Sequence, residues 1–420
     1  MIIKRVKIID PNSQYNGKVK DVKIENGTFV KIATNIESDY EEEVLEFEES
    51  CMSPGWFDLF AVLKDPGFEY KEDFGTCMAA AEKGGFTGIA LMPNTRPYVQ
   101  NKSEIEYIKS LSKRSLVEVV PLGCTTKDQN GKELTEMFDM YQAGALGFCD
   151  GLKALGSDIL LRALQYVKQF DGVVFDYPND ASLAVSTTMH EGNVSAALGL
   201  KGMPSIAEVL GVQRGIALLK YTKSKLHFAH ITSKESLSLI RSAKEKGLNI
   251  TVSVSSLNLM FNDRSLEDFD TNYKLKPFLR SEEDRLALIE AVKDGLIDVV
   301  CSNHNPEDQE SKDIEFLFAK HGAINLETSF SALIMAMGEN VNLNNIVQVL
   351  ALNPRNVLGL EVPVIEEGKQ ANVTIFDPYK NWTYSISNKI STVNNSPFLN
   401  KEIKGKALAV YNDGRLKKLE

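Results

Sequence analysis

The sequence is poor in cysteine and histidine, and both shortages limit the chemistry it can carry. Its five cysteines are widely scattered, an odd number, and form no Cys-x-x-Cys pair. That usage predicts reduced, buried thiols in a cytoplasmic protein and argues against a disulfide framework. Only five histidines occur in 420 residues. A hydrolytic metal centre built from several imidazoles would therefore need most of them.

The chain also lacks the marks of nucleic-acid-binding and membrane proteins. Acidic residues outnumber basic ones by 57 to 47, which gives a formal charge of -10, and no long basic block occurs. No apolar run approaches the roughly 20 residues that span a bilayer. The opening "MIIKRVKIID" lacks the apolar core and cleavage site of a signal peptide. We therefore expect neither nucleic acid nor a membrane as a partner.

What the sequence does contain is a regular alternation of strands and helices. Eight apolar strands are predicted, at 51–60, 86–94, 117–126, 145–150, 171–178, 225–232, 249–256 and 297–303. Segments with helical spacing lie between them, with Ser233 and Ser281 as predicted N-caps and Gly84, Gly247 and Gly295 as predicted left-handed C-caps. Eight strands with helical crossovers favour an α/β fold, a parallel (β/α)8 barrel of the TIM type, over a doubly wound open sheet.

The two ends of the chain differ from its middle. Residues 1–50 and 361–420 contain short β segments, and Asn26-Gly27 and Asp413-Gly414 are strong hairpin signals. We predict that these ends pair into one small composite β-sandwich domain, and that residues 51–360 form the barrel.

In such a barrel, side chains at the carboxyl ends of the strands form the active site. Among those side chains, His230, Asp150, Asp176 and His304 are the candidates for metal ligation. Residues alternate faces along a strand, so His227 and His230 should point to opposite sides unless the strand is bulged. We interpret His227 as a structural histidine, which leaves one imidazole on that strand for a site.

Many ordered motifs give the chain a family resemblance over essentially its whole length. They include "PGWFDL", "KDPGFEYKED", "EKGGFTGIALMPNTRP", "HFAHITSKES", "LKPFLRSEEDR" and "DGLIDVVCSNHNPE". With these motifs the chain resembles the dihydroorotases of the amidohydrolase superfamily. The resemblance implies the barrel fold, a place in pyrimidine biosynthesis and, for active members, a zinc-dependent hydrolysis of a cyclic amide.

The same resemblance implies that most metal ligands are missing. The family has Asp-x-His-x-His after its first strand, and Phe60 and Val62 stand at the two histidine positions. One acid, Asp150, remains after the fourth strand, and Tyr177 replaces a histidine after the fifth. His230 alone keeps a family ligand position, so no metal or other cofactor is expected.

The base and the substrate contacts are altered as well. Asn303 stands where the family has an aspartate that is both metal ligand and general base, and an amide cannot take a proton from water near neutral pH. Lys64 replaces the arginine that grips the substrate carboxylate. Asn94 is retained, Lys276 replaces an asparagine, and Glu307 replaces a histidine. These four positions are the candidates for residual substrate binding.

Three hypotheses follow. The first is a catalytically inactive, metal-free dihydroorotase homologue that acts as a structural or regulatory partner of aspartate transcarbamoylase in a homo- or hetero-oligomer; the partner is implied by the resemblance alone. The second is an active dihydroorotase, which interconverts dihydroorotate and N-carbamoyl-L-aspartate at a remodelled or mononuclear zinc site around His230 and Asp150. The third is a sensor that binds a pyrimidine precursor through Asn94 and Lys64.

Overall fold

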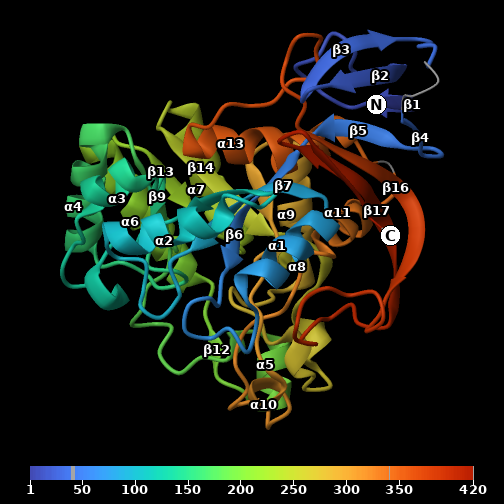
Figure 1. Cartoon of the computed structure of the whole chain (residues 1–420). Coiled ribbons are helices and arrows are strands. Elements are labelled where there is room, and N and C mark those ends of the chain that lie inside the picture. Colours follow the sequence, from blue (N-terminus) through green and yellow to red (C-terminus); the bar gives the residue numbers. More distant parts are fainter. Residues whose placement is uncertain (39–42, 340, 420) are drawn as a thin grey trace.

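A computed structural model describes residues 1–38, 43–339 and 341–419, and it consists of a barrel with a β-sheet at its side (Figure 1). Three parallel strands and five parallel strands form two hydrogen-bonded arcs. Isolated parallel bridges from Ala61 to His304 and from Gly123 to Phe148 join the arcs and close the barrel. In order around it, the strands are β6 (Trp56–Val62), β7 (Phe86–Met92), β8 (Glu118–Pro121), β9 (Gly147–Phe148), β10 (Val173–Asp176), β13 (Leu226–Phe228), β14 (Ile250–Ser255) and β15 (Val299–Cys301).

Helices surround this barrel and lie between its strands in the sequence, as predicted. The main ones are α1 (Phe74–Lys83), α2 (Lys102–Ser112), α3 (Met137–Ala143), α4 (Ser157–Val167), α6 (Ile206–Thr222), α7 (Lys234–Glu245), α9 (Glu282–Lys293), α11 (Ser329–Met337) and α13 (Asn353–Leu358). Ser233 and Ser281 cap α7 and α9 as predicted, each accepting a backbone N–H. The glycines after these helices are left-handed as predicted. The prediction for Gly84 is wrong, because Gly84 is right-handed and the next residue, Gly85, has φ 89°.

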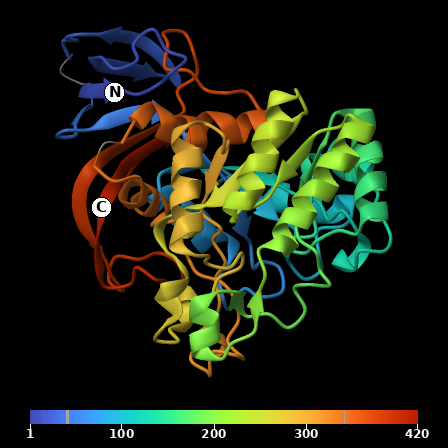
Figure 2. The ribbon, with the colours of Figure 1, turned by 180° about the vertical axis from the view of Figure 1, so that it is seen from behind.

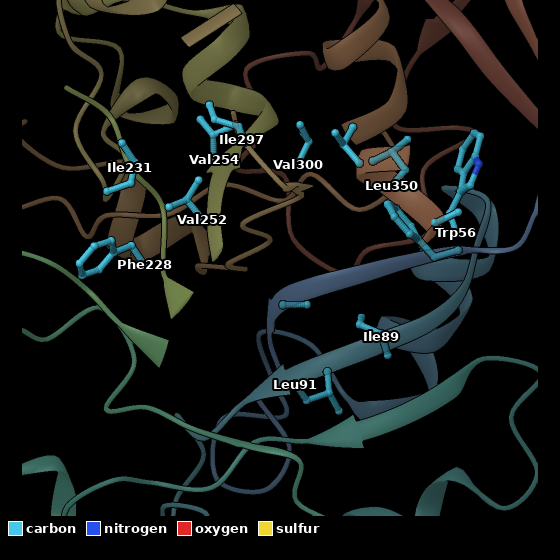
Figure 3. Close-up of a cluster of buried hydrophobic side chains, with 14 of the residues drawn as sticks. Trp56, Ile89, Leu91, Phe228, Ile231, Val252, Val254, Ile297, Val300 and Leu350 are labelled. Atoms are coloured by element: carbon cyan, nitrogen blue, oxygen red, sulfur yellow. The ribbon is translucent and has the colours of Figure 1, made fainter. Parts of the chain in front are cut away.

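A continuous apolar layer lies between the strands and the helices (Figure 3). Strand residues such as Val252 and Val300 face helical and loop residues such as Leu350 in this layer. Trp56, at the start of β6, is fully buried and packs its ring 4.5 Å from that of Phe330 and 5.2 Å from that of Phe376. Because Phe376 belongs to the sheet beside the barrel, this aromatic contact joins the two parts of the molecule.

Both ends of the chain enter that one sheet, as predicted (Figure 2 shows the blue and red strands on the same side of the barrel). Its order is β18 (Arg415–Lys418), β17 (Lys401–Asn412), β16 (Val373–Tyr384), β5 (Cys51–Pro54), β1 (Ile2–Ile8), β2 (Val19–Glu25) and β3 (Thr28–Ala33), with β4 (Val44–Glu46) beside β1. Asn26-Gly27 and Asp413-Gly414 form the predicted turns, all four residues having positive φ. Because β5 pairs with β1 and β16, this domain extends past the predicted boundary at residue 51 to Pro54.

Short elements cover the carboxyl ends of the barrel strands, several of them at the bottom of Figure 1. They include β11 (Met189–His190), α5 (Asn193–Leu198), β12 (Gly202–Met203), α8 (Ser256–Met260) and α10 (Gln309–Lys312). Among the described helices, none is both long enough and apolar enough to cross a membrane.

Candidate functional site

The end of β6 points two apolar side chains into the barrel. The pairing register of β6 with β7 shifts between Asp58 and Ala61, which marks a local irregularity in the strand. Phe60, within this stretch, and Val62, beyond it, belong to one buried cluster, whereas Ala61 belongs to the layer under the helices. Phe60 and Val62 therefore pack in the same buried apolar cluster as Phe175 and Cys301.

The Phe60 ring fills the space between three other rings. Its centroid lies 5.3 Å from that of Phe175 in an edge-on arrangement, 4.9 Å from that of His230 and 5.6 Å from that of His227. The side chain is 1% exposed. An apolar ring thus occupies the position at which the family resemblance places an imidazole.

The prediction that His227 and His230 point to opposite sides is wrong. Strand β13 ends before His230, which adopts a left-handed conformation with φ 57°, so the alternation of a regular strand does not extend to it. Both imidazoles contact Phe60. His227 Nδ1 lies 2.9 Å from Thr251 Oγ1, and His230 Nδ1 lies 3.3 Å from Cys301 Sγ.

Both imidazoles are neutral near pH 7. Burial lowers the pKa of His230 to about 3 and lowers the pKa of His227 well below its usual value. The Nε2 atoms of both residues are buried and have no hydrogen-bond partner within the described ranges. Neutral imidazole is the form that binds metal, and both of these rings pack against the ring of Phe60.

The Asp150 carboxylate forms hydrogen bonds with the backbone of a neighbouring loop. It accepts the N–H of Thr125 at 3.0 Å and the N–H of Thr126 at 2.9 Å, and it also accepts the Thr126 hydroxyl. Burial, partly opposed by these bonds, raises its pKa. The carboxylate therefore fixes the turn after β8, and the structure does not support the predicted pairing of Asp150 with His230 as two metal ligands.

Two further residues at the end of β10 are buried without ligand geometry. Neither oxygen of Asp176 has a hydrogen bond from any described residue, and the nearest cation is Arg214, with Nη2 3.8 Å from Oδ2. Burial raises the pKa of Asp176 to about 6. Burial also raises the pKa of Tyr177, and the Lys276 ammonium lies 5.6 Å from the centre of its ring.

The residues after β15 are engaged in packing contacts. Asn303 has φ 52° and donates its side-chain N–H to the Lys276 carbonyl oxygen at 3.1 Å. His304 Nδ1 accepts the N–H of Asn325 at 3.0 Å, and its Nε2 lies 2.6 Å from Glu72 Oε2. Both nitrogens of His304 are thus occupied, so this histidine orients buried loops and does not face the mouth as a free base.

Two of the positions considered for residual substrate binding are paired with each other. The Lys64 ammonium donates to Asn305 Oδ1 at 2.8 Å and to Glu307 Oε1 at 3.2 Å. Lys71, which the sequence analysis did not single out, donates to the other oxygen of Glu307 and lies 3.2 Å from Asp308. Glu307 therefore compensates the charges of both Lys64 and Lys71 within the chain.

Asn94 lies apart from that ion-pair cluster, against the chain after β9. A side chain at Gly151 would come within 2.7 Å of Asn94 Nδ2, so Gly151 leaves the room that Asn94 occupies. Its Oδ1 is buried without a partner among the described residues. The structure thus does not bring Asn94 and Lys64 into one hydrogen-bonded group.

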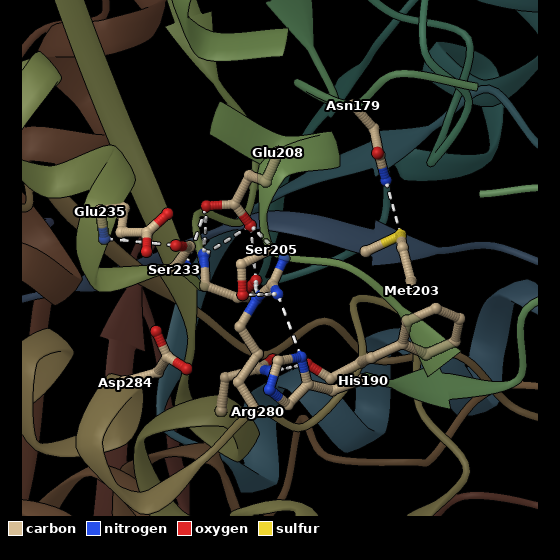
Figure 4. A network of polar contacts seen from close by, with 12 residues as sticks. Asn179, His190, Met203, Ser205, Glu208, Ser233, Glu235, Arg280 and Asp284 are labelled. Atoms are coloured by element: carbon tan, nitrogen blue, oxygen red, sulfur yellow. Dashed lines mark hydrogen bonds and ion pairs between the residues drawn. The ribbon is translucent and has the colours of Figure 1, made fainter. Parts of the chain in front are cut away.

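A second buried network, not anticipated from the sequence, fixes the loop after β13 (Figure 4). Glu208 on α6 accepts the N–H of Ser233 at 2.9 Å and forms an ion pair with Arg280 Nη2 at 3.2 Å. Arg280 also donates through Nε to Thr232 Oγ1, and its Nη1 lies 3.3 Å from His190 Nδ1. The signal in the sequence that could have indicated the Glu208–Arg280 ion pair is a glutamate at an apolar position of the helical pattern, because a buried charge needs a partner.

The residues present do not fit a zinc site of the usual composition. Such a site needs three or four nitrogen, oxygen or sulfur donors that converge on one point. Within residues 1–38, 43–339 and 341–419, no group of three or more His, Cys, Asp or Glu side chains is placed to hold a metal ion. Beside His230 lie the carbon ring of Phe60 and the thiol of Cys301, and Asp150 is engaged elsewhere.

The closed barrel with a sheet built from both chain ends is the architecture of the amidohydrolases, and the predicted fold class is confirmed. The fold matches an L-hydantoinase (dihydropyrimidinase) from Arthrobacter aurescens with a TM-score of 0.87 at 21% identity, over 100% of this chain and 96% of that one. It matches a D-hydantoinase (dihydropyrimidinase) from Thermus sp. with a TM-score of 0.81 at 19% identity, over 99% and 94%. The Amidohydrolase family model matches residues 180–415.

The sequence comparisons narrow this class. The Dihydro-orotase-like family model matches residues 50–236. The chain is 36% identical to a dihydroorotase of Geobacter metallireducens, over 99% of each chain. It is 35% identical to a dihydroorotase of Acetivibrio thermocellus, over 99% of this chain and 98% of the relative. The chain belongs to the dihydroorotase family.

Proposed function

We propose that this chain is a member of the dihydroorotase family that does not carry out the family's metal-dependent hydrolysis. The observation that supports the proposal most directly is the position of Phe60, whose ring packs 4.9 Å from that of His230 inside the barrel. Hydrolysis of a cyclic amide needs a metal-bound water or another activated nucleophile, together with a base that accepts its proton. Phe60 removes a donor where the metal would bind.

Asn303, His230 and His304 are poorly suited to act as that base. Asn303 carries an amide and not a carboxylate, and its side-chain N–H donates to the Lys276 carbonyl oxygen. His230 has a pKa of about 3 and is therefore a weak base near neutral pH. His304 has both ring nitrogens engaged. In this proposal, the three groups together leave water without activation.

In this proposal the chain serves pyrimidine biosynthesis as a structural or regulatory partner of aspartate transcarbamoylase in the cytoplasm. The family membership supports the pathway, and the family resemblance suggests the partner. All five cysteines are buried and unpaired, which accords with a reducing compartment. Mixing the purified chain with aspartate transcarbamoylase from the same source, followed by size-exclusion chromatography with light scattering, tests the association. Separate elution at micromolar concentrations would remove this partner.

The second candidate function is the dihydroorotase reaction itself, and the names of the relatives favour it more directly than they favour the first. Those relatives carry the name dihydroorotase at 36% and 35% identity over nearly whole chains. Activity would then need a rebuilt, mononuclear zinc site, with the unpartnered Nε2 of His230 as one ligand. Asp150 would have to release the loop it now holds to act as another.

One experiment separates the two functions. Zinc content is measured by mass spectrometry on protein purified without chelator, and ring closure of N-carbamoyl-aspartate is assayed with and without added zinc. We expect no stoichiometric zinc and no turnover above that of the buffer. About one zinc per chain together with turnover would overturn the first proposal in favour of the second.

A further inference from the structure

The outward face of helix α6, on the side of the barrel away from the sheet, carries large apolar side chains (Figure 1). Ile206, Leu210 and Tyr221 are 46%, 38% and 73% exposed. A helix on the surface of a globular protein normally turns its polar residues toward water and its apolar residues toward the core. The outward face of α6 therefore differs from what solvent alone would favour.

The helices on either side of α6 show the usual pattern. Helix α6 packs beside both α4 and α7. The exposed positions are Ser157, Asp158, Arg162 and Gln165 on α4, and Lys234, Glu235, Ser238, Arg241 and Glu245 on α7. All of these side chains are polar or charged. An apolar centre with a polar rim is the anatomy of a protein–protein interface.

The exposed residues of α6 have the spacing of a seam between two helices. They are Ile206, Leu210, Gln213, Ala217, Lys220 and Tyr221. The first five are separated by alternating steps of four and three residues, and all six lie within an arc of about 100° on one side of the helix. Such a stripe can contact a partner helix along the full 17 residues of α6, which is about 25 Å.

The order of residues along this stripe is complementary to itself when reversed. An antiparallel copy of α6 centred beside Gln213 places Leu210 opposite Ala217 of the second copy, and Ala217 opposite its Leu210. Large side chains thus meet small ones close to the centre, where the two helices approach most closely. At the ends, Ile206 lies opposite Tyr221 of the second copy. A parallel copy would instead place each residue against its own equivalent.

The charges at the two ends of α6 favour the same antiparallel orientation. Lys220 and Lys223 are exposed at its end, and neither forms an ion pair with any described residue. The segments that pair with its beginning carry two acids, Asp180 and Glu191, and one lysine, Lys201. An antiparallel copy brings the basic end of one helix toward the acidic end of the other, whereas a parallel copy brings like charges together.

We propose that the outward face of α6 is an interface between two copies of this chain, packed antiparallel about a two-fold axis beside Gln213. The occupant is a second copy because the face complements itself in size and in charge, as a two-fold interface requires. The exposed polar residues of α4 and α7 form the rim. This inference goes beyond the proposed function, since it needs neither a metal nor aspartate transcarbamoylase.

The first test is the oligomeric state of the full chain, measured by sedimentation velocity and light scattering. We expect a dimer at tens of micromolar. Leu210→Glu should raise the dissociation constant at least about hundredfold, because a two-fold interface contains the buried carboxylate twice. The matched control is Leu286→Glu on α9, where the leucine is 49% exposed, and it should leave the dimer unchanged.

Circular dichroism checks that the variants are folded, and Ala217→Arg replaces Leu210→Glu if that variant is not. A wild-type chain that is monomeric at tens of micromolar would overturn the proposal. A dimer that Leu210→Glu and Ala217→Arg both leave intact would also overturn it, because the interface would then lie elsewhere.

The second test determines the orientation of the two helices by disulfide cross-linking with diamide as the oxidant. All five native cysteines are buried, so an introduced surface thiol reacts alone. Leu210→Cys chains mixed with Ala217→Cys chains, after subunit exchange, should form covalent dimers. Neither variant should do so alone, because equivalent residues are then about 10 Å apart along the helix. Cross-linking of either variant with itself would overturn the antiparallel arrangement.

The outcome is separable from that of the function proposed above. Zinc-dependent turnover would overturn the inactive-homologue proposal whatever the oligomeric state. A monomer that binds aspartate transcarbamoylase would support that proposal and overturn the present one. Loss of this binding in Leu210→Glu would then assign the α6 face to that enzyme and not to a second copy.

Discussion

At the scale of single residues, Phe60 and His230 pack against each other at two positions where the family resemblance places metal ligands. Their ring centroids lie 4.9 Å apart, and both side chains are buried. Replacing an imidazole by a phenyl ring removes a donor and adds apolar surface in one step. The neighbouring imidazoles then persist as neutral members of the core.

This arrangement leads to an expectation for a restored histidine pair. In a chain carrying both Phe60→His and Val62→His, two imidazoles face the barrel interior beside His230, which provides three nitrogen donors for zinc. We expect the zinc content, measured by mass spectrometry after dialysis, to rise to about one per chain, while turnover stays absent because Asn303 is unchanged. The control is Phe60→Ala with Val62→Ala. Equal zinc content in the two double variants would show that these side chains do not converge.

The buried His230 also predicts a dependence of stability on pH. Its folded pKa of about 3 lies below the unfolded value of 6.5, so its neutral form is favoured by folding. The stability that follows from this pKa difference is fully present above pH 6.5 and is lost as pH falls toward 3. Between pH 6.5 and pH 5, the free energy of unfolding should fall by about 1.5 kcal/mol because of His230.

Urea unfolding at several pH values between 5 and 6.5 gives the slope of the free energy of unfolding against pH. This slope reports how many protons the chain takes up on unfolding, and His230→Gln should reduce that number by about one relative to wild type. His190, His227 and His321 are unchanged in the variant and cancel in the comparison. Identical slopes would mean that His230 is accessible to protons in the folded chain.

At the scale of elements, the loops after β6 and β15 are joined by one buried carboxylate. Glu307 pairs with Lys64 and Lys71, and all three side chains are buried. Glu307→Gln leaves two buried ammonium groups without that charge, and we expect a loss of about 3–5 kcal/mol in the free energy of unfolding. Chemical denaturation measures the change.

An exposed ion pair supplies the matched control. Asp171 pairs with Lys225, and its side chain is 82% exposed. Asp171→Asn should therefore change stability by no more than about 1 kcal/mol. Similar losses in the two variants would mean that Glu307 is hydrated and does not tie the two loops together.

Elements were easier to predict from the sequence than the partners of side chains. Apolar runs and turn residues located the eight barrel strands and both hairpins, because these signals are local. The partners of Lys64 were not predictable, since Glu307 lies 243 residues away in the chain. The direction of the His230 side chain was predicted wrongly for a local reason. His230 itself is left-handed, so side chains no longer alternate between the two faces of the strand at this position.

For the whole molecule, we expect the contact of Trp56 with Phe376 to couple the unfolding of the barrel to that of the sheet. Phe376 is fully buried at the junction. We expect Phe376→Ala to lower the free energy of unfolding by about 3–5 kcal/mol, and calorimetry to show one transition in wild type. Tyr379→Ala, on the same strand but 55% exposed, should have a small effect. Two separated transitions in wild type would contradict this coupling.

The pairing of β5 with both β1 and β16 also has a consequence for synthesis on the ribosome. Strand β5 ends at Pro54, and its partner β16 begins at Val373. At translation rates of roughly 5–20 residues per second, the first strands wait about 15 to 65 s for that partner. During this interval one edge of β5 is unpaired and open to other chains. Chaperone binding to nascent chains should therefore begin early and end only when β16 has emerged.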